Sequence, residues 1–141
     1  MDESSQRCVC ATLRKATRSV TQYFDNTLRP SGLRATQFNI LAEIRGAGEA
    51  TVTELTKILV MDQTTLTRSL VLLERDGLLR AVPKPDGRVK SVQLTTKGEL
   101  VLQAAFPLWA LAQENMIKSI GVEAWALLGS DLDRLARRPD Q

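Results

Sequence analysis

Five polar residues with groups that can bind anions stand at the start of one segment with helical periodicity. In this segment Leu66, Leu70 and Leu73 recur at steps of four and three residues, which is typical of the buried face of a helix. The polar residues around them are Gln63, Thr64, Thr65, Thr67 and Arg68. Hydroxyls and helix N-terminal amides donate hydrogen bonds to phosphate oxygens. The alternative is an ordinary solvated helix face.

A second group of charged residues surrounds a predicted β-hairpin. Residues 78–82 and 88–94 have the alternation of half-buried strands, and residues 83–87 separate them. Pro85 fixes its φ angle and Gly87 accepts a positive φ angle, so a turn is favoured between the strands. The charged residues near the tip are Lys84, Asp86, Arg88 and Lys90. The alternative is a turn with flanking charges that only interact with water.

Composition narrows the possible functions. The chain of 141 residues has a formal net charge of +3, which permits a nucleic-acid partner without requiring one. It contains no histidine, the commonest general base and metal ligand near neutral pH, and it shows no grouping of nucleophile and carboxylates. We therefore expect that the protein is not an enzyme and that it has neither a cofactor nor a metal site. With no long apolar stretch and a polar N-terminus, we expect a cytoplasmic protein without membrane contact.

Helical periodicity and capping signals predict the remaining elements. A helix is expected over residues 8–29, a second over 36–45 with Thr36 as N-cap, and a third over 52–59. The third begins with the capping box Thr51-Val-Thr-Glu54, and the fourth is capped by Asp62.

Two further helices are expected after the hairpin. One runs from a cap at Thr96 to about Ser119 and is bent by Pro107, and the last begins at Val122. The apolar residues of the first of these cover more than one of its faces, which suggests burial against a second subunit as well as its own domain.

Two short helices joined by a few residues, the second with polar groups at its start, form a helix-turn-helix pattern. The predicted fold is mainly α with a small β-hairpin wing. We divide it into an N-terminal dimerisation helix (1–34), a winged helix-turn-helix (35–98) and C-terminal dimerisation helices (99–141).

In this order, several short motifs resemble those of the MarR family of winged helix-turn-helix regulators. They are Gln37-Phe-Asn-Ile-Leu41, Thr53-Glu-Leu55, Asp62-Gln-Thr-Thr-Leu-Thr-Arg-Ser-Leu70, Leu73-Glu-Arg-Asp-Gly-Leu78, Asp86-Gly-Arg88 and Val92-Gln-Leu-Thr-Thr-Lys-Gly98. Each motif alone is weak, but their order and spacing are specific.

The resemblance implies a homodimeric, DNA-binding transcriptional repressor released by a small-molecule or redox effector. It places the fourth helix in the major groove and Arg88, oriented by Asp86, in the minor groove. The implied DNA contacts are Thr53, Gln63, Thr64, Thr65, Thr67, Arg68, Lys84, Asp86, Arg88 and Lys90. The alternative function is a winged-helix module that binds a protein and does not read DNA.

Two regions are candidates for sensing an effector. Such regulators often bind an aromatic or phenolic acid between the dimerisation helices and the winged module. The candidate residues are Arg14, Arg18, Tyr23, Phe24, Phe38, Phe106 and Trp109, with core packing and solvation as the alternatives.

Cys8 and Cys10 could sense oxidants or soft metals if a nearby cation favours the thiolate, or Cys10 could be a small apolar residue on the first helix.

Overall fold

The computed structural model describes residues 2, 6–85 and 90–137. Six α-helices, one short 3-10 helix and three β-strands follow one another in these residues. In chain order they are α1 (Val9–Leu28), η1 (Arg29–Ser31), α2 (Ala35–Ala47), β1 (Ala50–Thr51), α3 (Val52–Leu59), α4 (Gln63–Arg75), β2 (Leu79–Pro83), β3 (Lys90–Leu94), α5 (Thr96–Ile120) and α6 (Val122–Ala136). The mainly helical fold with a hairpin wing is confirmed.

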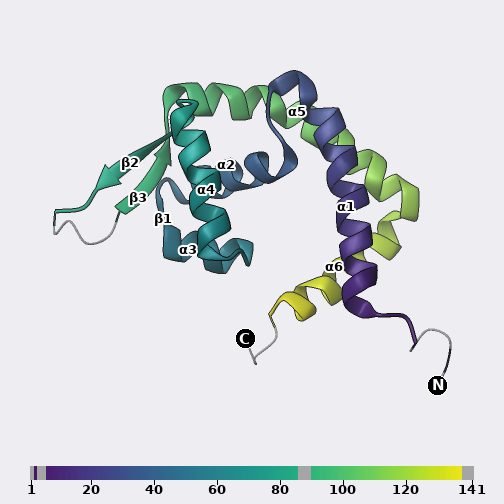
Figure 1. Ribbon diagram of the computed structural model, residues 1–141. Coiled ribbons are helices and arrows are strands. Elements are labelled where there is room, and N and C mark those ends of the chain that lie inside the picture. Colours follow the sequence, from purple (N-terminus) through teal and green to yellow (C-terminus); the bar gives the residue numbers. More distant parts are fainter. Residues whose placement is uncertain (1, 3–5, 86–89, 138–141) are drawn as a thin grey trace.

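The elements form two regions joined by α5. The winged module contains α2, α3, α4 and the sheet, and its β2–β3 hairpin projects from one side of the molecule (Figure 1). On the other side, α1 lies beside the C-terminal part of α5, and α6 follows. α5 continues through Pro107 and changes direction along its length, as expected of a helix that contains proline (Figure 1).

The sheet is antiparallel, with strand order β1-β3-β2. β2 is therefore an edge strand, which explains how Pro83 can end it without removing a central hydrogen bond. The sequence did not predict β1, which consists of two residues that pair with Val92 and Ser91. A strand this short has no periodicity of its own and depends on β3 beside it.

The predicted N-caps of two helices are wrong by one or two residues. α2 is capped at Arg34 instead of Thr36, because Asp25 of α1 accepts a hydrogen bond from the Ala35 backbone N at 2.7 Å. α5 is capped by Thr95 instead of Thr96, and the Thr95 hydroxyl accepts from the Gly98 backbone N at 3.0 Å. The bond from Ala35 to Asp25 joins two helices, so the sequence around α2 does not reveal it, whereas the Thr95 cap is local and lies one residue before the predicted position.

The apolar core lies in the winged module and reaches the adjoining turns of α1 and α5. Its fully buried large side chains include Leu28, Ile40, Leu41, Ile44, Leu55, Leu66, Leu73 and Leu102. By contrast, α6 contains no buried residue in the single chain. None of the helices in the described part of the chain has the length and apolar character needed to cross a membrane.

Candidate nucleic-acid interface

The start of α4 is held by its own cap. Asp62 accepts a hydrogen bond from the Thr65 backbone N at 3.0 Å and another from the Thr65 hydroxyl at 2.6 Å. These bonds, that of the hydroxyl first, lower the pKa of the Asp62 carboxyl below its ordinary value. Asp62 is therefore the N-cap of α4, as predicted. The Thr65 hydroxyl proton is already used inside the protein, so this hydroxyl can accept from a ligand but cannot donate to it.

The remaining polar residues of α4 face solvent. Gln63, Thr64, Thr67 and Arg68 are exposed, whereas Leu66, Leu70 and Leu73 between them are buried against the core. Thr53, which the sequence predicts as a further contact, is also exposed, on α3. The buried leucines therefore fix the rotation of α4, and the polar groups form a continuous outward row.

The turn between α3 and α4 is short and conformationally constrained. As predicted, α3 starts at the Thr51 cap, whose hydroxyl accepts from the Glu54 backbone N at 3.1 Å. It ends at Val60, which has a φ angle of 52° although it is β-branched and 62% exposed. Such residues rarely adopt the left-handed conformation. Met61 then packs against the core, so the turn is anchored on one side.

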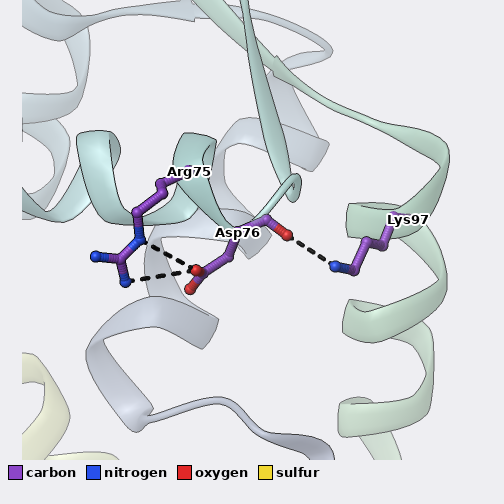
Figure 2. Close-up of polar contacts among 3 residues, drawn as sticks. All are labelled: Arg75, Asp76 and Lys97. Atoms are coloured by element: carbon purple, nitrogen blue, oxygen red, sulfur yellow. Dashed lines mark hydrogen bonds and ion pairs between the residues drawn. The ribbon is translucent and has the colours of Figure 1, made fainter.

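The far end of α4 is joined closely to the start of α5. Lys97 donates from its Nζ atom to the backbone O of Asp76 at 2.9 Å, and Arg75 pairs with the Asp76 carboxylate (Figure 2). A Cβ atom on Gly98 would lie 2.1 Å from the Leu78 backbone O, so the two backbones approach as closely as only glycine permits. The position of α4 is thereby tied to α5.

The wing brings together only some of the charged residues predicted there. Lys90 is exposed at the start of β3. Lys84 instead forms an ion pair with Glu49, with 2.8 Å between its Nζ and Glu49 Oε1. Asp86 and Arg88 lie outside the described residues. Glu49 was not predicted, because nothing in its local sequence indicates a contact with residues 35 and 42 positions further along the chain.

The aromatic residues between the two regions form two sets of ring contacts. Trp109 of α5 stacks on Phe38 of α2 with ring centroids 5.6 Å apart, and Phe106 contacts the same indole at 5.5 Å. Phe38 is 4% exposed and belongs to the core. Tyr23 contacts Phe24 edge to face, and its hydroxyl accepts from Asn115 at 3.0 Å.

A hollow of about 310 Å³ lies beside these rings. Its lining is Val20, Thr21, Phe24, Ala35, Asn39, Trp109 and Gln113. Of the predicted pocket residues only Phe24 and Trp109 line it. Arg18 lines another surface hollow on α1, and Arg14 is exposed. The amides of Asn39 and Gln113 were missed, since isolated Asn and Gln residues carry no distinctive sequence signal.

The two cysteines lie at the start of α1, both as exposed free thiols. Cys8 is the N-cap, and its Sγ accepts from the Ala11 backbone N at 3.4 Å. Arg7 and Lys15 line the same surface hollow as Cys8. Cys10 is exposed in the single chain, so it is not a buried apolar residue there. In the described part of the chain, no three His, Cys, Asp or Glu side chains are grouped as a metal site.

The helix-turn-helix, with its outward polar row and hairpin wing, defines a winged-helix protein of the kind found among transcriptional regulators. Residues 31–88 match the model of the MarR family. The MosR transcriptional regulator of M. tuberculosis, solved in complex with DNA, is 40% identical. The match covers 93% of this chain and 95% of that one, with a TM-score of 0.86. The chain belongs to the MarR family.

Two further relatives are similar over different lengths. A mutant of MarR from E. coli, solved with operator DNA, has a TM-score of 0.81 at 26% identity over 90% of this chain and 92% of that one. The multiple antibiotic resistance protein MarR of Salmonella typhimurium is 40% identical over 80 residues. That match covers 56% of each protein, so the chain spans little more than half the length of this curated relative.

Proposed function

We propose that this protein is a sequence-specific DNA-binding transcriptional regulator. The observation that carries the proposal is the outward row of Gln63, Thr64, Thr67 and Arg68 on a helix whose rotation is fixed by buried leucines. Such a helix start fits the major groove, where amide, hydroxyl and guanidinium groups reach base edges and phosphates. Further DNA contacts on either side of this row come from Thr53, Thr65 and Lys90. Arg88, oriented by Asp86, enters the minor groove. Such a regulator acts in the cytoplasm.

We further propose that the protein acts as a homodimer through the regions 1–34 and 99–141. Support comes from apolar side chains that a single chain leaves uncovered on α5 and α6. Those most relevant are Leu111, Ile120, Val122, Trp125, Leu127, Leu128 and Leu135, between 37% and 72% exposed. A second copy can cover this surface with the same surface of its own, since a two-fold interface is self-complementary. The dimer then presents two α4 helices to successive turns of a pseudo-palindromic operator.

We also propose that the regulator is a repressor and that binding of an effector releases it from its operator. The hollow near Trp109 offers a flat apolar ring beside the neutral amides of Asn39 and Gln113, which suits a small aromatic or phenolic ligand. Cys8 and Cys10 are accessible to an oxidant or a soft metal, and Arg7 and Lys15 line the same surface hollow as Cys8. Either event changes operator affinity only if it favours a dimer with a different spacing of the two α4 helices.

The test begins with selection of duplexes from a random library, followed by anisotropy titrations of the selected sequence and a scrambled control. We expect Arg68→Ala to weaken binding about 5- to 150-fold and to relax the preference at one position of each half-site. Arg88→Ala should weaken binding and flatten the salt dependence by about one unit of slope for each of the two wings of the dimer. Arg75→Ala removes one positive charge from an exposed side chain at the opposite end of α4 and serves as the control. Equal binding of all variants would refute the proposed interface.

The same titrations address the alternative function. A winged-helix module that binds only a protein would show no selected sequence. At physiological salt its affinity for duplex DNA would be only the weak, sequence-independent affinity expected of a protein with a net charge of +3. The effector is sought separately by thermal shift with aromatic acids, soft metals and peroxide, because a ligand of the native state raises the melting temperature.

A further inference from the structure

Glu49 lies in the loop between α2 and β1, where both of its carboxylate oxygens bind the wing. Lys84, just after β2, donates from Nζ to Glu49 Oε1 at 2.8 Å. Ser91, in β3, donates from its hydroxyl to Glu49 Oε2 at 2.8 Å. One side chain thus joins both strands of the hairpin to the end of the helix-turn-helix scaffold.

The contact with Ser91 is anchored in the interior. Ser91 is 1% exposed, the lowest exposure of any polar side chain in the described residues, and its hydroxyl needs an acceptor because an unpaired buried donor is costly. The side chains of Lys84 and Glu49 are 36% and 39% exposed. The hydrogen bonds from Lys84 and then Ser91 lower the pKa of the Glu49 carboxyl, so this group stays ionised. The acceptor for Lys84 is therefore charged and held in place.

We propose that Glu49 is a positioning residue of the wing that keeps Lys84 away from DNA phosphates, in place of the contact that the sequence predicts for Lys84. This inference rests on the proposed DNA binding. If Lys84 moved to a phosphate, the Glu49 carboxylate would be left with Ser91 alone while facing a polyanion. The repulsion and the lost charge-assisted bond would offset the new contact. The pair is electrically neutral, so it displaces no counterion from the duplex.

Lys90 provides the contrast on the same hairpin. It pairs across the ladder with Pro83, and its side chain is exposed. Within the described residues no carboxylate lies at ion-pair distance from it. Lys84 and Lys90 thus differ in whether a carboxylate of the described residues neutralises their charge, although they stand at the same end of the wing.

The experiment measures how the affinity for one selected duplex depends on salt, between about 50 and 200 mM. Each phosphate contact contributes about 0.9 to the slope of log affinity against log salt. The variants are Lys84→Met, Glu49→Gln, the double variant and Lys90→Met. Glu49→Gln keeps the size of the side chain and an acceptor for Ser91 but removes the charge that holds Lys84. Melting temperatures of all variants check the fold.

We expect Lys84→Met to leave the slope unchanged, and Glu49→Gln to steepen it by about 1.8 by freeing Lys84 in both copies of the dimer. The double variant should return to the wild-type slope, and Lys90→Met should flatten it by about 1.8, because the dimer loses one contact from each of its two wings. A flatter slope for Lys84→Met, or an unchanged slope for Glu49→Gln, would overturn the inference. A wild-type protein that binds no duplex would instead refute the proposed function, and the two failures are therefore distinct.

Discussion

The winged module and the terminal helices differ in how completely one chain buries their apolar side chains. In the winged module, Ile44, Leu55 and Leu66 have no exposed surface. In α6 no residue is buried, and Val122 and Leu127 are each 72% exposed. Since burial stabilises by about 25 cal/mol per Å² of apolar surface, the first region has gained this stabilisation within one chain and the second has not. The winged module therefore has its apolar core within one chain, whereas α6 leaves apolar side chains uncovered that the proposed dimer would bury.

The largest effect is expected for Leu66→Ala, in the core beneath the polar row. Removing this fully buried side chain should lower the free energy of unfolding by about 2–5 kcal/mol, because it loses apolar burial and leaves a cavity. Val71→Ala on the same helix is the control. Val71 is 57% exposed, so its truncation should change stability by less than about 0.5 kcal/mol. Urea titrations measure both, and equal losses would contradict the contrast between buried and exposed faces of α4.

Trp125→Glu should act on assembly and leave the winged module folded. A buried tryptophan is a frequent interface hot spot, so we expect dimerisation to weaken by about 2–4 kcal/mol. Affinity for a two-site operator should fall with it. Analytical ultracentrifugation over a range of protein concentrations measures the dimer. Val71→Glu introduces the same charge on an exposed apolar residue of the winged module and should leave the dimer intact. A stable Trp125→Glu dimer would show that α6 is not the covered surface.

Gly98→Ala tests the joint between the two regions. The added Cβ would meet the Leu78 backbone O at 2.1 Å, so α5 must move away from the segment between α4 and β2. We expect a loss of about 1–3 kcal/mol in stability, typical of overpacking, and weaker operator binding by a protein that still dimerises. Gly46→Ala on α2 is the matched control, because nothing lies within 4 Å of its Cβ position. It should stabilise the helix by up to about 1 kcal/mol. A neutral Gly98→Ala would mean that the joint is loose.

The smallest effect is expected for Asp62→Ala, which removes the cap of α4, and this effect should depend on pH. Because the folded-state pKa of Asp62 is lowered, its contribution is present above the pKa of the unfolded chain. It is lost as the pH falls through the lower folded-state pKa. The stability difference between the wild type and Asp62→Ala should therefore shrink on acidification. Unfolding titrations from neutral to acidic pH measure it, and a difference independent of pH would show that the charge of Asp62 plays no part.

Local patterns were sufficient for most of the fold and for the polar row. The spacing of Leu66, Leu70 and Leu73 identified which side of α4 is buried, because a helix repeats every 3.6 residues whatever surrounds it. The caps at Thr51 and Asp62 were also correct, since each bonds an amide three residues away on its own helix. Chemistry confined to one turn of chain can be inferred from the order of residues.

The order of residues did not determine the contacts between different helices and strands. Asp25 caps α2 from α1, and the Thr95 hydroxyl, which caps α5, also donates to the Gly77 backbone O at 2.5 Å. Glu49 forms an ion pair with Lys84, which the sequence predicts as a DNA contact. In each case the partner is at least ten residues away, and many partners are equally compatible with the sequence. Only the packed fold selects one, because it brings a particular donor within hydrogen-bond distance of a particular acceptor.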